Sequence, residues 1–310
     1  MGDDQEVIYV STGRPKPPIP YNMRDMVLPG DAACPGCPIP MAWKVLSAVF
    51  GEKMILVIPA CCSSVVVGTY PFHSLKTSII HVPFASAAAV ASGTAEALER
   101  RGILDVQVVA WAGDGGTADI GMASLSGAAE RNNNILYIMY DNEAYMNTGI
   151  QRSSSTPLGA WTTTTPIKGK IEPKKDVAKI MIAHGVSYVA TASIGYPHDF
   201  YNKLQKAKGI RGFKFIHLHA PCPIGWRFDP RYTVRIAKLA VETGLWILYE
   251  YHDGKLTISS PSRAYMDPSK RKPIEEYIKL QGRFRNITEE LLSEIKRQMD
   301  ANWEWIKKHM

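Results

Sequence analysis

The most informative stretch of the sequence is Val108-Val-Ala-Trp-Ala-Gly113-Asp114-Gly115-Gly116-Thr117. Its apolar run predicts a buried strand, and the glycines directly after it predict a sharp turn without side-chain bulk. In such a turn the backbone N–H groups can approach phosphate oxygens closely, and a helix that begins just beyond adds its positive end. The stretch therefore predicts an anion site at the end of a strand.

Apolar, β-branched runs alternate with helical patterns on both sides of this stretch. Strands that are apolar on both faces and alternate with helices are typical of an α/β protein with one parallel sheet covered by helices on both faces. We therefore predict this fold class. The predicted strands cover 54–59, 106–112, 135–140, 187–191 and 213–219, and the predicted helices cover 41–50, 84–101, 120–132, 175–184 and 197–208.

The chain divides into three parts. Residues 1–30 are rich in proline and lack periodicity, which predicts an extended arm. Residues 31–230 hold the alternating elements and form one α/β domain. The C-terminal extension, 231–310, contains a helical stretch, a hairpin pattern that turns at Asp253-Gly254 and a terminal amphipathic helix. We expect this extension to pack on the domain or on a partner subunit.

The composition is that of an ordinary soluble protein, with 45% apolar and 21% charged residues in 310. The net charge of +7 is diffuse, so it does not indicate nucleic-acid binding. It fits a solvated surface or the docking of an acidic protein such as a small electron carrier. The sequence shows no secretory signal pattern and no uncharged apolar run of about 20 residues. We expect a cytoplasmic protein that does not bind a membrane.

A metal site is predicted beside the glycine-rich turn. Asn142 stands directly after the next predicted strand, so its side chain and that of Asp114 are expected at the same carboxyl edge of the sheet. Two oxygen side chains, a backbone carbonyl and two diphosphate oxygens would nearly complete the octahedron that Mg²⁺ prefers. We predict Asp114 and Asn142 as side-chain ligands and Ala144 as the carbonyl donor. The alternative is that Gly-Asp-Gly-Gly forms only a tight turn.

The five cysteines indicate metal or redox chemistry, because structural disulfides are rare in cytoplasmic proteins. Cys34-Pro-Gly-Cys37 alone is compatible with zinc, an iron–sulfur cluster or a redox dithiol. Cys61-Cys62 and Cys222 follow predicted strands, so they are expected at the same sheet edge as the turn. Adjacent side chains in an extended segment point opposite ways, so one of Cys61 and Cys62 is expected to be a ligand. One close pair with two single cysteines is unlike the paired spacing of a zinc ribbon.

The sequence shows two resemblances, one to a broad class of enzymes and one to a family within it. Gly113-Asp-Gly115, followed by Asn142 after the next strand, is similar to the signature of thiamine-diphosphate enzymes. Longer segments resemble beta subunits of the 2-oxoacid:ferredoxin oxidoreductases, and pyruvate-specific members above all. These segments are 30–37, 141–149, 151–157, 220–226 and 228–230.

The resemblance implies thiamine diphosphate, Mg²⁺ and a 4Fe-4S cluster as cofactors. Family members read Gly-Cys-Ser-Ser where this chain has Cys61-Cys62-Ser-Ser, which favours Cys62 as the ligand and leaves Cys61 as a departure that packs or modulates the cluster. Zinc is the alternative metal. The predicted cluster ligands are Cys34, Cys37, Cys62 and Cys222.

The resemblance also implies partner subunits and a reaction. The Glu that activates the cofactor is expected from an alpha subunit, and gamma and delta subunits complete the complex. The implied reaction is the coenzyme-A-dependent oxidative decarboxylation of a 2-oxoacid, with electrons passed to ferredoxin. Pyruvate is the leading substrate, and 2-oxoisovalerate, aryl 2-oxoacids and oxalate are the alternatives. The four separated cysteines argue against a thiamine-dependent decarboxylase or a lipoamide-linked dehydrogenase. A zinc or iron–sulfur protein with an incidental turn is the non-enzymatic alternative.

Further residues are assigned with less direct support from the pattern. Asn147 and Thr148 are expected to contact diphosphate or metal-bound water, or to form only a turn. His73 and His81 are candidates for the substrate pocket, or serve as structural hydrogen-bond partners. Trp111 and Met146 are expected to pack around the site. The predicted cofactor contacts are Gly113, Asp114, Gly115, Gly116, Asn142, Asn147, Thr148, His81 and Cys62.

Overall fold

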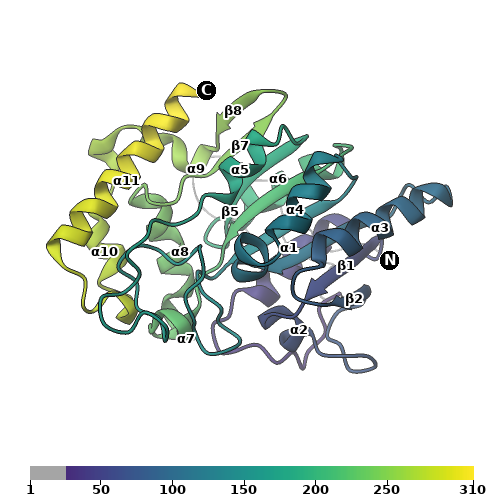
Figure 1. Cartoon of the computed structure of the whole chain (residues 1–310), viewed down its shortest axis with the longest axis horizontal. Helices are drawn as coiled ribbons and strands as arrows, with labels where there is room; N and C mark the ends of the chain where they lie inside the picture. The colour runs from purple at the N-terminus through teal and green to yellow at the C-terminus, as the bar shows by residue number, and fades with distance from the viewer. Residues whose placement is uncertain (1–25) are drawn as a thin grey trace, which may run out of the picture.

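One eight-stranded sheet organises the chain. The computed structural model describes residues 26–310, so most of the predicted arm 1–30 lies outside the described residues. The strand order is β2-β1-β3-β4-β6-β5-β7-β8, in which β1 to β6 are parallel and β7 and β8 are antiparallel (Figure 1). The strands are β1 Met54–Pro59, β2 Ser78–Val82, β3 Gln107–Gly113, β4 Leu136–Asp141, β5 Tyr188–Ser193, β6 Lys214–His219, β7 Tyr249–His252 and β8 Lys255–Ile258.

Helices cover both faces of the sheet, so the predicted fold class is confirmed. The helices α1 and α6 pack on one face, and α3, α4, α5 and the end of α11 pack on the other. Their bounds are α1 Ile39–Phe50, α3 Ala87–Arg100, α4 Met122–Glu130, α5 Val177–Ala183, α6 Pro197–Lys208 and α11 Glu289–Lys308.

The central strand β3 shows why the two faces differ. Trp111 points to the α1 side, where its ring lies 6.1 Å from that of Trp43. Ala110 and Ala112 point to the other side, towards the alanine-rich start of α3. Because these side chains are small, α3 can lie close to the strand that carries the glycine-rich turn.

Two predictions of elements need correction. The helix predicted over 120–132 begins only at Met122, because a π-helical turn, η2 Gly115–Asp119, comes first. Strand β2 and helix α2 Cys62–Val67 were not predicted. The strand β2 lies at the sheet edge and is half exposed, so it lacks the continuous apolar run that marks the inner strands.

The C-terminal extension continues the sheet. The hairpin turns at Asp253 and Gly254, both with positive φ, and β7 pairs with β5. The helices beside it share a third apolar cluster with Leu158 and Trp226, at one end of the molecule (Figure 1). The remaining short elements are α7 Pro223–Trp226, η3 Pro230–Tyr232, α8 Thr233–Glu242, α9 Ser260–Arg263, η4 Ala264–Met266, η5 Pro268–Lys270, α10 Ile274–Ile278 and η6 Gly282–Phe284.

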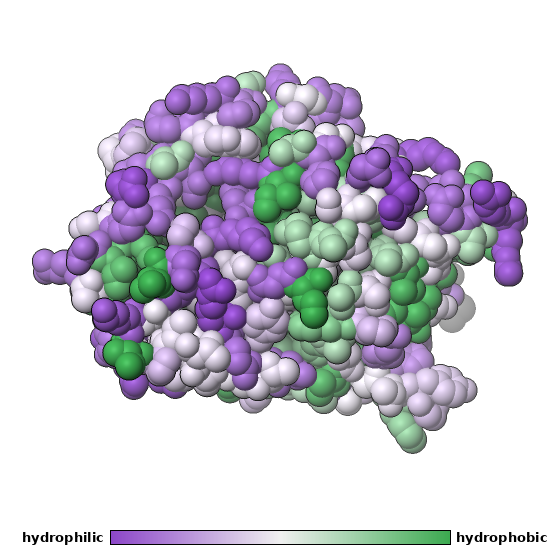
Figure 2. Space-filling model, viewed as in Figure 1, coloured by the Kyte–Doolittle hydropathy of each residue, from purple (hydrophilic) through white to green (hydrophobic). Residues whose placement is uncertain are grey.

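The surface is mostly polar, and weakly apolar residues gather over α3 and α4 (Figure 2). These helices expose alanines and Gly93, with Ile120 beside them. In residues 26–310 no helix combines the length and the apolar character needed to cross a bilayer.

Candidate active site

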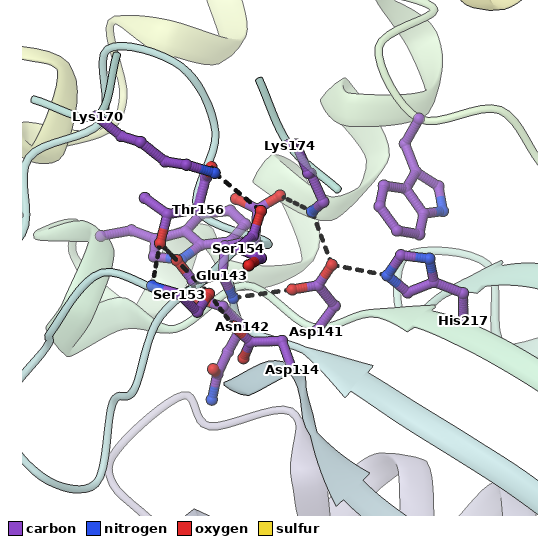
Figure 3. A network of polar contacts seen from close by, with 12 residues as sticks. Asp114, Asp141, Asn142, Glu143, Ser153, Ser154, Thr156, Lys170, Lys174 and His217 are labelled. Atoms are coloured by element: carbon purple, nitrogen blue, oxygen red, sulfur yellow. Dashed lines mark hydrogen bonds and ion pairs between the residues drawn. The ribbon is translucent and has the colours of Figure 1, made fainter. Parts of the chain in front are cut away.

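Two loops meet at the carboxyl edge of the sheet. Gly113 at the end of β3 is paired in register with Tyr140 of β4. The turn that starts at Asp114 and the loop that starts at Asp141 therefore leave the sheet side by side. The second loop folds back over the first and is tied to it by a hydrogen bond from Ser153 to Asp114 (Figure 3). A second hydrogen bond runs from Ser154 to Asp119.

The structure brings the three predicted magnesium ligands together. The Asn142 amide lies 2.9 Å from Asp114 Oδ1 and 3.1 Å from the Ala144 carbonyl oxygen, and with its nitrogen turned towards them it donates to both. In an octahedron with Mg–O distances of about 2.1 Å, neighbouring ligands lie about 3.0 Å apart. With its oxygen turned towards them, the amide would complete three of the six corners. We call Asp114, Asn142 and the Ala144 carbonyl the oxygen site.

Asp114 is a buried carboxyl group beside a second one, Asp141. Its side chain is buried and accepts a hydrogen bond from Ser153 Oγ. Burial, followed by the nearby charge of Asp141, raises the pKa of Asp114 well above its usual value. A buried carboxylate beside another carboxylate lacks compensating charge, which a divalent cation would supply.

The glycine turn leaves no room for side chains. A Cβ at Gly115 would overlap the Tyr145 ring, and one at Gly116 would lie 3.1 Å from the Phe84 ring. Tyr145 is held in place because its hydroxyl donates to Asp119 at 2.9 Å. The π-helical turn formed by these residues is a conformation found often at functional sites.

A network of charged side chains lies beside the oxygen site. Lys174 Nζ is 2.7 Å from Asp141 Oδ2 and 2.5 Å from Glu143 Oε1, and His217 Nε2 is 2.7 Å from Asp141 Oδ2 (Figure 3). Burial alone would raise the pKa values of Asp141 and Glu143. The positive charge of Lys174, helped by His217 at Asp141 and by Arg283 at Glu143, outweighs burial and lowers both.

A second cation reaches this network from the C-terminal extension. Arg283 Nη2 forms an ion pair with Glu143 Oε2 at 2.6 Å, and its guanidinium stacks 3.6 Å above the centre of the Trp226 ring. Trp226 in turn donates from Nε1 to the Asn142 carbonyl at 2.7 Å. Arg283 and Trp226 therefore both contact the loop that carries the oxygen site.

Four cysteines, the thiol site, lie near one another along the same edge. They are Cys34, Cys37, Cys62 and Cys222. Cys62 begins α2 after β1, and Cys222 caps α7 after β6 and accepts a hydrogen bond from Gly225 N at 3.3 Å. The Cys34–Cys37 loop rests against the start of α8, because Thr233 Oγ1 donates to the Gly36 carbonyl at 2.9 Å. Gly36 has a φ of 74°, and a Cβ there would lie 2.8 Å from Pro230 Cβ.

The thiols influence one another electrostatically. Burial, reduced by a backbone hydrogen bond and reinforced by Cys222 and Cys34, raises the pKa of Cys37 to about 12. Burial and then Cys222 and Cys61, with Cys37 and Asp114, raise the pKa of Cys62. Thiolates gathered in this way require a positively charged centre to stay ionised.

Cys61 has hydrogen-bond partners outside this set. It caps α2 and exchanges hydrogen bonds with Ser64, and its environment is dominated by burial and by Tyr140. Among the described residues, no three His, Cys, Asp or Glu side chains are gathered around one point as a single metal ion would require.

The other predicted residues lie at the surface or at the β2 edge of the sheet. Thr148 is exposed and bonds Tyr145 and Gln151 within its own turn, and Asn147 is exposed beside it. His73 and His81 line a surface hollow at the β2 edge, two strands from β3. Their assignment to the cofactor or the substrate pocket stays a prediction.

Two large side chains pack as expected. Trp111 stacks on Tyr140 with ring centres 5.7 Å apart and donates to Ser63 Oγ at 2.9 Å. Met146 packs on the third apolar cluster, beside Trp226.

Sequence reasoning missed the residues that support the oxygen site. They are Glu143, Ser153, Lys174, His217 and Arg283. Glu143 stands between two predicted ligands, which was a usable signal. The others come from distant segments, and only the fold reveals them.

Comparison with known proteins first gives the class. A family model described as the C-terminal TPP-binding domain of thiamine pyrophosphate enzymes matches residues 60–218. This range contains the glycine-rich turn and the oxygen site. The fold and the site therefore define a domain that binds thiamine pyrophosphate, which is thiamine diphosphate, and this predicted cofactor is confirmed.

Similarity to individual proteins identifies the family within this class. The pyruvate synthase subunit PorB of Methanothermobacter marburgensis is 51% identical over 281 residues, covering 89% of this chain and 96% of the relative. The ketoisovalerate oxidoreductase subunit VorB of Pyrococcus abyssi is 49% identical over 290 residues, covering 90% and 91%. A solved structure of 2-oxoglutarate:ferredoxin oxidoreductase from Magnetococcus marinus is similar with a TM-score of 0.57 and 25% identity, covering 70% of this chain and 80% of that chain.

The chain belongs to the family of beta subunits of 2-oxoacid:ferredoxin oxidoreductases. It is thus the thiamine-diphosphate-binding subunit of an oxidoreductase complex. This confirms the predicted family and sets aside the non-enzymatic alternative.

Proposed function

We propose that this subunit binds thiamine diphosphate through Mg²⁺ at the oxygen site and a 4Fe-4S cluster at the thiol site. One observation carries the proposal: the two sites share one edge of the sheet, because Cys62 begins α2 after β1 and Asp114 follows the neighbouring strand β3. Such proximity suits a cofactor that must give electrons to a cluster.

Each site residue has a role in this proposal. Asp114, Asn142 and the Ala144 carbonyl would hold Mg²⁺, and the backbone N–H groups of the turn at Gly113, Gly115 and Gly116 would bind the diphosphate. Bound thiamine diphosphate supplies a carbanion that attacks the carbonyl of a 2-oxoacid. The thiols of Cys34, Cys37, Cys62 and Cys222 would hold the cluster.

Pyruvate is the substrate that we propose, with acetyl-CoA and CO₂ as products and ferredoxin as acceptor. The relative at 51% identity is a pyruvate synthase subunit. The relative at 49% identity is a ketoisovalerate oxidoreductase subunit, which keeps 2-oxoisovalerate as the second candidate. Alpha, gamma and delta subunits would complete the complex, and the alpha subunit would supply the activating Glu.

The assembled complex provides the test. We expect viologen reduction that requires both pyruvate and coenzyme A and that is faster with pyruvate than with 2-oxoisovalerate. The reverse preference would assign the second substrate, and activity without coenzyme A would indicate oxalate. Anaerobically purified protein should absorb broadly near 400 nm and contain about four irons per chain. Zinc without a visible band would refute the cluster.

A further inference from the structure

The loop that carries the oxygen site is held by a residue outside the matched domain. The thiamine-pyrophosphate-binding match ends at residue 218, whereas Arg283 belongs to the C-terminal extension. Its side chain is 3% exposed, so the guanidinium is buried beneath the loop. A buried charge in that position has a large cost of desolvation unless its partners compensate it.

The contacts of Arg283 bracket Asn142. On one side, its ion pair at 2.6 Å holds the carboxylate of Glu143. On the other side, its stacking on Trp226 at 3.6 Å holds the indole that donates to the Asn142 carbonyl. Arg283 therefore contacts both Glu143, the next residue in the chain, and Trp226, the hydrogen-bond partner of the Asn142 carbonyl.

The backbone of Glu143 has a conformation that other contacts must stabilise. Glu143 has a φ of 65°, a left-handed conformation that non-glycine residues adopt at a cost. Its peptide N–H donates to Asp141 Oδ1 at 3.0 Å, and its carbonyl accepts from Thr156 at 2.7 Å. The two oxygens of its side chain are divided between Lys174 and Arg283.

From these contacts we infer that Arg283 is a positioning residue for Mg²⁺. It fixes Glu143 and Trp226, and through them the directions of the Asn142 side chain and the Ala144 carbonyl. The inference rests on the proposed magnesium site and adds the C-terminal extension to it. Residues that orient metal ligands from behind typically change metal affinity 10- to 100-fold when replaced.

The sign of the effect separates positioning from simple electrostatics. Arg283 is a cation near a cation site, so Coulomb repulsion alone predicts that its removal strengthens Mg²⁺ binding. Positioning predicts the opposite, because the ligands lose their orientation. The same substitution thus gives opposite results under the two explanations.

The test uses the assembled complex with saturating thiamine diphosphate and a calorimetric titration with Mg²⁺. We expect Arg283→Gln to weaken Mg²⁺ binding about 10- to 100-fold and Arg283→Lys to have a smaller effect. Arg285→Ala is the matched control, since Arg285 is exposed two residues away, and it should stay within about twofold. Mg²⁺ binding by Arg283→Gln that equals or exceeds that of the wild type would overturn the inference.

A second variant provides the test if Arg283→Gln does not fold. Arg283→Gln combined with Glu143→Gln removes both partners, so it leaves no unpaired charge from this pair. If the single variant does not fold, weak Mg²⁺ binding by the folded double variant supports positioning, and wild-type affinity overturns it. Failure of the wild-type complex to bind Mg²⁺ with thiamine diphosphate would instead refute the proposed site itself.

Discussion

The oxygen site and the thiol site share one sheet edge but are built in different ways. The side chains of the oxygen site rest on a network of ion pairs and hydrogen bonds that comes from four segments of the chain. The thiol site is held mainly by backbone features, namely the Gly36 turn on Pro230 and the helix starts at Cys62 and Cys222. The first site is therefore arranged in the absence of an ion, whereas the proposed cluster at the second would offset the raised pKa values of the Cys37 and Cys62 thiols.

The largest effect is expected from Asp114→Ala. It removes a ligand of the oxygen site, so Mg²⁺-dependent retention of thiamine diphosphate should fall at least about 100-fold, beyond the loss typical of supporting residues. The absorbance near 400 nm should remain. Calorimetry and absorption spectra measure the two properties, and Asp105→Ala, an exposed carboxylate, is the control. Loss of both properties would mean that Asp114 is a folding residue.

Cys222→Ser tests the other site. The variant should lose most of its iron and its band near 400 nm, while thiamine diphosphate still binds. Cys61→Ser should keep both, because Cys61 faces Tyr140 and Ser64. Iron analysis measures the iron content of each variant, and absorption spectra measure the band near 400 nm. A Cys61→Ser protein without iron would place Cys61 among the ligands.

His219, whose ring lies 5.5 Å from that of Trp226 and 4.8 Å from that of Trp246, gives a pH prediction. Burial, together with the charges of Lys174 and Arg283 and against those of Glu143 and Asp141, lowers the pKa of His219 to about 3. An unfolded histidine has a pKa of about 6.5, so the stability that comes from the neutral ring is present above that pH and is lost as the pH falls towards 3.

The matching measurement is urea unfolding of His219→Phe between pH 7 and pH 4. This group accounts for a loss of about 1.4 kcal/mol per pH unit below pH 6.5, and the variant should lack that part of the slope. His309→Ala, at an exposed histidine, should keep the wild-type slope. Equal slopes for wild type and His219→Phe would show that the buried ring does not control acid stability.

The smallest effect is expected from Ser153→Ala. The variant loses one hydrogen bond to Asp114 but keeps the ligand, so Mg²⁺ affinity should fall about 10-fold. Ser154→Ala, whose hydroxyl bonds Asp119 instead, should change the affinity less. An effect of Ser153→Ala as large as that of Asp114→Ala would make the hydroxyl itself part of the metal site.

The sequence allowed much of the fold to be predicted, because inner parallel strands leave a strong apolar signal. The strand that ends at Gly113 and the one that ends at Asp141 were placed within one residue. The edge strand β2 was missed because it is short and half exposed. The π-helical turn was missed because its two adjacent glycines, Gly115 and Gly116, have no side chains and so carry no periodicity.

The closeness of Asp114 and Asn142 in space was predictable for a similar reason. Asp114 and Asn142 each follow a strand, and parallel strands bring their ends together. Lys174 and Arg283 could not be placed, because their partners lie 31 or more residues away along the chain and no periodic pattern connects them. Supporting residues of this kind become visible only when the loop closes over the turn.

One feature of the thiol site concerns how the protein must be handled. Cys34 is exposed, while Cys37, Cys62 and Cys222 are partly shielded. Oxidation of cysteine follows solvent access, so dissolved dioxygen or peroxide meets this corner before any other part of the site. With the proposed cluster at this site, air should inactivate the subunit from Cys34 inwards and leave the oxygen site intact, and an aged preparation would then bind thiamine diphosphate without transferring electrons.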